Sequence, residues 1–325
     1  MAEWLYEAGI GEERAILVES GEIVAARVCW GEPVRAGLVA EARLASKPAG
    51  VRRGLARLDD GSEVLVDALP AMVNEGDALR VRIVRPALAE RGRAKLALAR
   101  VTAQEPRPAP TLREQLEEFA ARPVRISGPD FADLGWDELI DEAVTGEVAF
   151  PGGSLVIAET PAMTLIDVDG HLPPAELALA AVRPIALTVE RLDLGGSVGI
   201  DFPTVAEKSD RQAVHAAFGK ALRDWRGERT AMNGFGFVQL VSRRERPSLV
   251  ARYAHRGEAG ARILLRRAER VREPGALELT ANPATRRAVL PEWEAELARR
   301  TGRSIRWRED PTLALTAGFA QAVPA

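Results

Sequence analysis

The sequence predicts a mixed α/β fold with a small β-barrel inserted near its N-terminus. Three observations lead to this prediction. Residues 38–101 hold several short apolar strands separated by turns, which suits a small Greek-key barrel. Residues 152–202 hold two β-branched, aliphatic runs joined by a helical segment, the pattern of buried strands in a covered sheet. Residues 250–325 again alternate strand and helix patterns.

The composition is that of a globular protein with aliphatic cores. The chain has 325 residues, a length typical of two or three compact units. Hydrophobic residues make up 46% of it and aromatic residues only 5%. The single cysteine, Cys29, excludes a disulfide or a cysteine zinc site within one chain. No apolar run reaches transmembrane length and the N-terminus lacks a signal-peptide pattern, so we expect a cytoplasmic protein without membrane contact.

The net charge of −3 argues against indiscriminate binding of polyanions, but the charge is unevenly distributed. Residues 243–308 hold 17 arginines and 8 glutamates, a local net charge of +9, so the remainder sums to −12. Arginine clusters of this kind suit contacts with phosphate. A solvated helix surface is the competing interpretation, and it is the preferred one for Glu292–Arg300.

The first hundred residues are predicted to be β-structure. Residues 3–30 alternate as two strands about a turn at Ser20-Gly21. The expected barrel strands are Val39–Leu44, Gly54–Leu58, Glu63–Val66, Ala78–Val84 and Lys95–Arg100. Five short strands suit a barrel of the OB type, which often binds single-stranded nucleic acid through a basic groove and stacking aromatics.

The predicted barrel is basic but lacks stacking side chains. Residues 38–100 hold 12 Lys and Arg against 8 acids, yet no Phe, Trp or Tyr occurs between Trp30 and Phe119. Any grip of this barrel on RNA should therefore be electrostatic and salt-sensitive. A purely structural barrel is an equally supported alternative.

The rest of the chain is predicted to alternate helices and strands. A proline-rich linker occupies residues 103–111. Pro174 starts a helix through roughly Val182, which Pro184 kinks or ends. Further helices are expected at Leu112–Ala121, Trp136–Ala143, Lys208–Arg226 and Ala284–Thr301. Further strands are expected at Phe235–Val241, Ala261–Arg266, Leu277–Ala281 and Ser304–Trp307.

Aspartates stand at the ends of the two apolar runs in residues 152–202. Asp167 and Asp169 share one face of a strand because strand side chains alternate, and Asp201 arrives at the same end if the two runs are sheet neighbours. Such carboxylates are costly unless a cation neutralises them. Hard oxygen ligands suit Mg²⁺, with Mn²⁺ as an alternative. A turn that merely ends a strand explains each aspartate alone, whereas a metal site is favoured for the three together.

Other catalytic motifs lack support in the sequence. There is no phosphate-binding Gly-x-x-x-x-Gly-Lys loop, and the chain has only three histidines. A Mg²⁺ held by Asp167 and Asp201 would activate water against a phosphodiester, with Asp169 as an orienting group or a third ligand. Basic residues would position the RNA backbone. The candidates are Arg211, Arg243, Arg244 and Arg246, with Arg43 and Lys47 on the barrel.

Several segments resemble the ribonuclease E/G family in order and spacing. They are Gly152–Ile157, Ala162–Asp169, Asp193–Phe202, Phe235–Leu240 and Pro247–Leu249, with a weaker likeness over residues 277–315. The resemblance implies a ribonuclease H-like part from residues 1–37 and 103–150, with an S1 domain of the OB type inserted at 38–102. It further implies a DNase I-like catalytic subdomain at 151–249 and a small C-terminal α/β domain at 250–325.

The resemblance also implies a function. Family members are Mg²⁺-dependent endoribonucleases that cleave single-stranded RNA in RNA processing or decay. Their two metal-binding aspartates fall on Asp167 and Asp201, and a neighbouring asparagine that orients the site falls on Asp169. Single-stranded RNA is therefore the implied partner.

The sequence departs from the family pattern at several points. Asp169 in place of asparagine adds a charge and removes a hydrogen-bond donor, and Ala178, Ala180 and Pro184 stand where polar residues are usual. These departures motivate an alternative, a catalytically weakened relative that binds RNA. The short segment before Phe150 indicates that the family's sensor of 5′-monophosphate ends is missing. The Cys-Pro-x-Cys zinc link is absent, so any oligomer would form without zinc.

Overall fold

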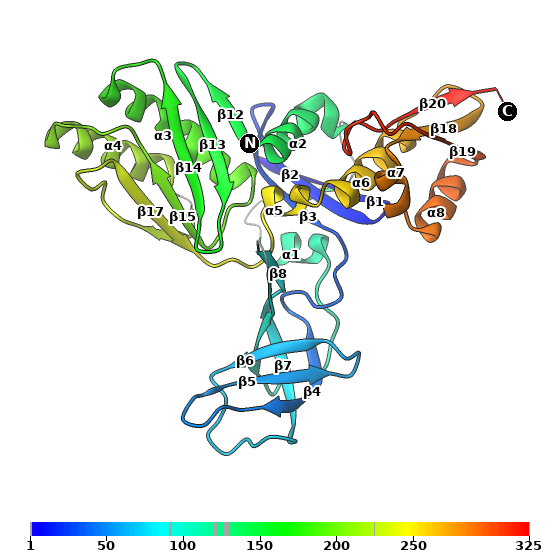
Figure 1. Ribbon diagram of the computed structural model, residues 1–325, viewed down its shortest axis with the longest axis horizontal. Helices are drawn as coiled ribbons and strands as arrows, with labels where there is room; N and C mark the ends of the chain where they lie inside the picture. The colour runs from blue at the N-terminus through cyan, green and yellow to red at the C-terminus, as the bar shows by residue number, and fades with distance from the viewer. Residues whose placement is uncertain (1, 91–92, 120–122, 127–129, 224, 325) are drawn as a thin grey trace.

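The computed structural model describes residues 2–90, 93–119, 123–126, 130–223 and 225–324. The chain forms a mixed α/β structure with a closed β-barrel, so the predicted α/β class and the inserted barrel are confirmed. In the view of Figure 1 the barrel extends downward, a six-stranded sheet lies on the left and the C-terminal residues lie on the right. None of the described helices is both long enough and apolar enough to cross a bilayer.

A four-stranded sheet at the N-terminus has the order β11-β1-β2-β3. Its strands are β1 (Glu3–Gly9), β2 (Glu12–Glu19), β3 (Glu22–Cys29) and β11 (Val124–Arg125). The alternation over residues 3–30 predicted two strands about one turn, and the turn at Ser20-Gly21 is confirmed. The prediction missed a second turn, where Gly11 adopts a φ of +71° that favours glycine.

The barrel closes through five strands in the order β10-β6-β5-β4-β7. They are β4 (Val39–Ser46), β5 (Arg53–Leu58), β6 (Glu63–Asp67), β7 (Ala78–Arg85) and β10 (Ala97–Val101), each close to its predicted place. Valine, leucine, isoleucine and alanine fill a core of its own. A short hairpin, β8 (Leu88–Glu90) and β9 (Arg93–Lys95), lies between β7 and β10 in the chain and was not predicted.

Short helices follow the barrel, as predicted, and the expected end of the first one at Ala121 lies outside the described residues. In α1 (Leu112–Phe119) the preceding Thr111 and Glu114 form a capping box: Glu114 N donates to Thr111 Oγ1 at 3.1 Å and Thr111 N donates to Glu114 Oε2 at 2.7 Å. A 3₁₀ helix, η1 (Phe131–Leu134), leads into α2 (Trp136–Thr145). The buried Phe131 and Trp136 belong to the largest core.

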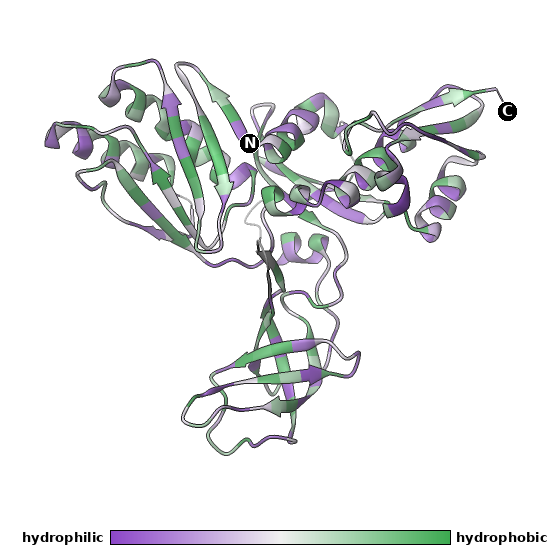
Figure 2. Ribbon diagram, viewed as in Figure 1, coloured by the Kyte–Doolittle hydropathy of each residue, from purple (hydrophilic) through white to green (hydrophobic). Residues whose placement is uncertain are grey.

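The six-stranded sheet has the order β12-β13-β14-β15-β17-β16. Its strands are β12 (Glu147–Phe150), β13 (Gly153–Glu159), β14 (Thr164–Gly170), β15 (Ser197–Asp201), β16 (Gly227–Arg229) and β17 (Phe237–Ser242). Hydrophobic and hydrophilic residues alternate along these strands (Figure 2). Residues such as Ile166, Val198 and Ile200 are buried on one face, and the opposite face is open to solvent.

Two helices, α3 (Pro174–Arg191) and α4 (Lys208–Ala221), cover the buried face of this sheet. The predicted end of this helix near Val182 is wrong: Pro184 does not end α3, which continues for about two more turns to Arg191. Pro184 cannot donate the hydrogen bond of a helix interior. Beyond it, however, Ile185, Ala186 and Val189 are buried in the core, and this burial outweighs the missing bond.

The C-terminal residues contain helices and a three-stranded sheet of order β19-β18-β20. The elements are α5 (Leu249–Ala254), α6 (Arg256–Glu269), β18 (Ala276–Ala281), α7 (Pro283–Ala288), α8 (Pro291–Thr301), β19 (Ile305–Glu309) and β20 (Phe319–Val323). The strand predicted at Ala261–Arg266 is wrong, because Ala261, Leu264 and Leu265 form the buried stripe of helix α6. The helix predicted at Ala284–Thr301 is interrupted before Pro291, which starts α8.

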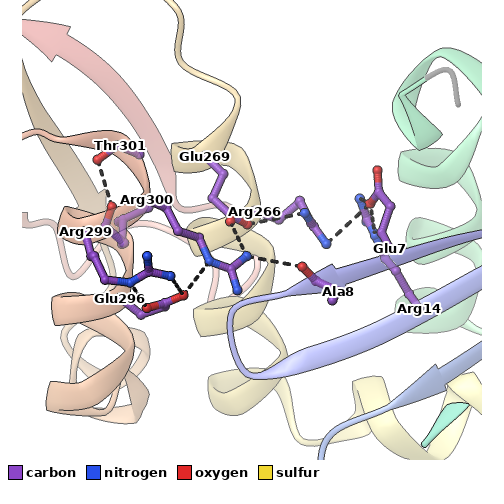
Figure 3. Close-up of polar contacts among 10 residues, drawn as sticks. Glu7, Ala8, Arg14, Arg266, Glu269, Glu296, Arg299, Arg300 and Thr301 are labelled. Carbon is purple, nitrogen blue, oxygen red and sulfur yellow. Dashed lines mark hydrogen bonds and ion pairs between the residues drawn. The ribbon is translucent and has the colours of Figure 1, made fainter. Parts of the chain in front are cut away.

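An ion-pair network joins the N-terminal sheet to the C-terminal helices (Figure 3). Glu7 of β1 pairs with the buried Arg14 of β2 at 2.6 Å and with Arg266 of α6 at 3.3 Å. Glu269 of α6 pairs with Arg266 at 3.3 Å and with Arg300 of α8 at 2.9 Å. Part of the arginine excess in residues 243–308 therefore stabilises the fold.

Candidate active site

Asp167 and Asp201 lie side by side on the open face of the six-stranded sheet. β14 and β15 are parallel neighbours, and their register pairs Asp167 with Asp201. Residues paired in this way project to the same face. Both aspartates are exposed, whereas Ile166 and Ile200 beside them are buried. The prediction that the two apolar runs are sheet neighbours is therefore confirmed, and the metal-binding role of the aspartates stays a prediction.

The pairing continues as a row of residues that crosses the sheet. Val156 of β13 pairs with Asp167, and Glu147 of β12 pairs with Val156. On the other side of the aspartates, Phe237 of β17 pairs with Asp201. The two carboxylates thus lie between an aliphatic and an aromatic side chain, with a further carboxylate two strands away.

Glycines allow the strands of the site to approach closely. A Cβ atom on Gly153 would lie 2.2 Å from the carbonyl oxygen of Asp169, and a Cβ atom on Gly199 would lie 2.6 Å from Cζ of Phe237. Gly153 therefore keeps β13 against the end of β14 that carries Asp169. Gly199 leaves space for the Phe237 ring next to Asp201.

The carboxylates of the site repel one another. Burial and the charges of Asp169 and Asp201 raise the pKa of Asp167 above its ordinary value. Within the described residues, none of these three aspartates forms an ion pair with a lysine or an arginine. A divalent cation would supply the countercharge, so the donor set fits a metal that prefers carboxylate oxygen.

The third aspartate does not complete a cage of protein ligands. The part of the chain that the structure describes contains no group of three or more His, Cys, Asp or Glu side chains placed to hold a metal ion. Asp169 is opposite Ser154 of β13, two residues along the strand from Asp167. The two aspartates therefore suit a metal ion that needs few protein ligands. Mg²⁺ commonly takes one or two carboxylates and otherwise keeps water and phosphate oxygens.

Two arginines that follow β17 and were predicted to contact RNA are hydrogen-bonded to carboxylates of the chain. Arg244 Nη2 donates to Glu159 Oε1 at 3.1 Å, and Glu159 also accepts from Ser248 Oγ at 2.7 Å. Arg246 Nε donates to Asp193 Oδ2 at 2.5 Å. These bonds attach the segment after β17 to the end of β13 and to the loop before β15. A phosphate contact by either arginine stays a prediction.

Arg211 and Arg243 differ in their surroundings. Arg211 Nη1 donates to the carbonyl oxygens of Val205 and Ala206 at 2.7 and 2.5 Å, which fixes the loop that follows Asp201. Arg243 is exposed, and its side chain makes no hydrogen bond or ion pair within the described residues. Of the two, Arg243 has the guanidinium that is available to a phosphate.

Arg43 and Lys47, the barrel residues predicted to contact RNA, also form hydrogen bonds within the chain. Arg43 Nη1 donates to the carbonyl oxygen of Gly76 at 2.6 Å, and Lys47 Nζ donates to that of Val73 at 2.7 Å. Lys47 begins the loop between β4 and β5, and this loop borders a pocket on the barrel. The pocket is lined mainly by Ser46, Pro48, Val51, Arg52, Arg53, Leu55, Leu65 and Asp67.

Two residues near the carboxylates, Glu147 and Phe237, were not predicted from the sequence. Glu159, also not predicted, lies at the other end of β13 opposite Thr164 and binds Arg244. Glu147 and Phe237 enter the site only through strand register, which a single sequence does not reveal. Glu159 ends the β13 run immediately before a turn, and this position was its only signal.

The comparisons with known proteins point to one family. The model of the ribonuclease E/G family matches residues 70–245, more than half of the chain. A segment of 111 residues is 32% identical to the chloroplastic ribonuclease E/G-like protein of Arabidopsis thaliana, and it covers 30% of this chain and 11% of that protein. A segment of 151 residues is 32% identical to ribonuclease G of Haemophilus influenzae, and it covers 42% of this chain and 30% of that protein.

The matched segments span less than a third of the length of either relative. The family model, in contrast, covers the barrel's last strands, the linker and the whole six-stranded sheet with its aspartates. This chain belongs to the ribonuclease E/G family.

Proposed function

We propose that this chain is a Mg²⁺-dependent endoribonuclease that hydrolyses phosphodiester bonds in single-stranded RNA. The observation that carries the proposal is the register that sets Asp167 beside Asp201 on an exposed face without a basic partner among the described residues. Family membership and the names of the two relatives support RNA as the substrate. RNA processing or decay in the cytoplasm is part of the same proposal.

Asp167 and Asp201 would hold the metal ion, which is Mg²⁺ or, as a substitute, Mn²⁺. When bound, such an ion supplies an activated water and stabilises negative charge on the phosphate. Asp169 lies on the same face and can accept a hydrogen bond from water or from a ribose hydroxyl. It would thereby orient the nucleotide next to the carboxylate pair.

Basic residues would hold the RNA backbone on either side of the site. Arg243 is exposed and follows the end of β17 that lies away from Asp201, so it suits a phosphate contact further along the RNA backbone. Arg211 would first act by fixing the loop that follows Asp201. Arg244 and Arg246 would fix loops at the opposite end of the same strands. The barrel pocket would bind RNA further along the strand, as the OB type of barrel commonly does.

A cleavage assay tests this proposal. The purified chain is incubated with an end-labelled single-stranded RNA in Mg²⁺, in Mn²⁺ and in EDTA. We expect internal cleavage in either metal and none in EDTA. Asp201→Asn should lose at least about 100-fold in rate, because a ligand of the metal loses its charge.

The matched control is Asp141→Asn, which removes an exposed carboxylate on α2. This variant should cleave like the unmodified chain. Cleavage that persists in EDTA, or an Asp201→Asn variant as active as the control, would falsify the proposal.

The alternative is a relative that binds RNA but has weakened catalysis. Two observations favour it: the described residues offer no cluster of three metal-binding side chains, and α3 carries Ala178, Ala180 and Pro184 where the family resemblance implies polar residues. Salt-sensitive RNA binding without cleavage, in both the unmodified chain and Asp201→Asn, would support this alternative.

A further inference from the structure

The turn that leads into β17, next to the end of the strand that carries Asp201, holds an aromatic side chain that contributes nothing to the folded core. Phe235 is 83% exposed, and among the described large hydrophobic residues only Met72, on the barrel, is comparably exposed at 84%. Phe235 lies two residues before Phe237, the first residue of β17, which pairs with Asp201. Its place next to the site calls for an explanation other than packing.

The backbone around Phe235 is fixed. Asn233 Oδ1 accepts hydrogen bonds from Phe235 N at 2.9 Å and from Phe237 N at 3.0 Å. Asn233 N donates to the carbonyl oxygen of Phe237 at 3.1 Å, and Gly236 N donates to that of Asn233 at 3.2 Å. Four hydrogen bonds within five residues therefore hold the turn in one conformation while its phenylalanine stays in solvent.

The same turn is bound directly to the strand that carries Asp201. Gly236 has a φ of +91°, and a Cβ atom there would lie 2.4 Å from the carbonyl oxygen of Phe202. Phe202 N in turn donates to the carbonyl oxygen of Gly236 at 3.3 Å. Phe202 follows Asp201 in the chain, so Phe235 is kept at a constant place relative to the carboxylate pair.

The open face is apolar on the side of the pair away from Phe235. Leu165 and Gly199 precede the aspartates along their strands, whereas Phe235 lies beyond the other ends of those strands. A Cβ atom on Gly199 would meet Phe237 at 2.6 Å, Met163 at 2.9 Å and Leu165 at 3.0 Å, so these three side chains converge above that glycine. A flat, weakly polar ligand would therefore find contact area here. Because the adjoining carboxylates are negative, a negatively charged part of the ligand, such as a phosphate, must bind together with a cation.

We propose that Phe235 is a base-stacking residue, which binds an unpaired nucleobase next to the phosphodiester at Asp167 and Asp201. This inference rests on the proposed function, because the phosphate is what brings the base to this face. A rigid, solvent-exposed phenyl ring provides the flat contact that an unstacked base needs, and stacking accepts every base. The barrel lacks an aromatic residue in its sequence, so the stacking platform that it does not provide would lie at the sheet instead.

The placement also accounts for a preference for single strands. A base in a duplex is stacked on its neighbours and cannot lie on a side chain without being extruded. Phe235 would therefore be a positioning residue that selects nucleotides already free of a helix.

The test uses RNA binding and fluorescence, which do not depend on activity. Affinity for a fluorescent single-stranded oligoadenylate is measured in Ca²⁺, and cleavage is measured separately in Mg²⁺. Phe235→Ala should weaken binding by about 10- to 100-fold and lower kcat/KM to match, as loss of one stacked base does elsewhere. Phe235→Trp should restore both, because indole stacks at least as well as phenyl.

Fluorescence supplies a direct signature of stacking. In Phe235→Trp, bound RNA should quench the added indole emission relative to the unmodified chain. The matched control is Leu179, a side chain that is 50% exposed on α3, the helix that covers the opposite face of the sheet. Leu179→Ala should bind RNA normally, and Leu179→Trp should show no added quenching.

The outcomes separate this inference from the proposed function. If the chain cleaves RNA and Phe235→Ala binds and cleaves like Leu179→Ala, the inference is wrong while the nuclease stands. If nothing is cleaved but RNA quenches Phe235→Trp, the nuclease proposal fails and the stacking residue stands. If Phe235→Ala instead changes the sedimentation mass and leaves RNA affinity unchanged, the exposed ring belongs to a contact between copies of the chain, which also overturns the inference.

Discussion

The negative charge of Asp167 is unfavourable in the folded chain, and no basic residue among the described residues neutralises it. Its pKa is raised by burial and by Asp169 and Asp201, and neither a lysine nor an arginine of the described residues pairs with it. Carboxylates that repel one another in this way are typical of sites whose function outweighs local stability. The same two charges that destabilise the metal-free chain would stabilise it when a cation binds.

Asp167→Asn should therefore change stability in opposite directions with and without metal. Without metal, the variant should gain no more than about 0.5 kcal/mol in unfolding free energy, because solvent screens exposed charges. In Mg²⁺ the melting temperature of the unmodified chain should rise through linkage, and that of the variant should not. Calorimetric melting with Mg²⁺ and with EDTA measures both effects.

Asp141→Asn again serves as the control, and it should keep the metal-dependent rise. An equal rise for Asp167→Asn would show that the ion binds elsewhere.

Two arginines in the segment after β17 should separate RNA binding from fold stability. Arg243 is exposed and makes no side-chain bond within the described residues, whereas Arg246 is bonded to Asp193, whose side chain is 14% exposed. Arg243→Gln should weaken RNA binding and reduce the slope of log affinity against log salt by about 0.7. Arg246→Gln should lower the unfolding free energy by about 1–2 kcal/mol, because a largely buried carboxylate loses a charged partner.

Fluorescence anisotropy over a NaCl series, without divalent metal, gives the affinities and slopes, and urea unfolding gives the stabilities. Each variant is the control for the other. If Arg246→Gln changed the salt slope and left stability intact, Arg246 would be the phosphate contact.

At the scale of the element, the end of strand β14 depends on a glycine in its neighbour. Gly153→Ala would bring a methyl group to 2.2 Å from the carbonyl oxygen of Asp169, a backbone atom that cannot rotate away. We expect a loss of about 1–3 kcal/mol in unfolding free energy, because the strands must separate to accept the methyl. Metal affinity should fall as well, since Asp167 lies on the displaced strand.

Gly234→Ala is the matched control, because a Cβ atom there meets nothing within 4 Å. Urea unfolding should place this variant within about 0.5 kcal/mol of the unmodified chain. A Gly153→Ala variant as stable as Gly234→Ala would mean that β13 and β14 tolerate the added group.

The elements predicted well are those whose sequence pattern is compatible with only one type of secondary structure. The barrel strands alternate between turns rich in glycine and aspartate, and the observed boundaries lie within a few residues of the predicted ones. The misses have a common cause in tertiary contacts. Burial of Ile185 and Val189 carries α3 through Pro184, and the apolar residues at 261–266 form a short run that suits a strand or a buried helix equally.

At the scale of the whole molecule, Arg14 connects parts of the chain that are distant in sequence. Its side chain is 1% exposed and donates to Glu7 at 2.9 and 2.6 Å. Its guanidinium lies 4.8 Å from the ring centroids of both Phe131 and Trp136, and Glu7 also pairs with Arg266 of α6. The N-terminal sheet, helix α2 and the C-terminal residues thus meet around one cation.

Arg14→Ala should lower the unfolding free energy by about 3 kcal/mol, because a buried ion pair loses one partner and two rings lose their contact. Arg113→Ala is the control. Arg113 is exposed and pairs with Glu117 four residues away, so its loss should cost less than about 0.5 kcal/mol. Urea unfolding measures both, and similar losses would show that the network adds little.

The sequence by itself determined the mixed α/β class, the inserted barrel, the family resemblance and the three aspartates of the candidate site. These features depend on local residue patterns, which alternation and turn residues express directly. Only the tertiary structure decided which strands are neighbours, and with that the pairing of Asp167 with Asp201 and the row that adds Glu147 and Phe237. It also showed that most of the basic residues predicted to contact RNA already bind within the chain. The physical reason is that strand register and side-chain partners are set by packing between segments far apart in the chain, where many arrangements satisfy the same local pattern.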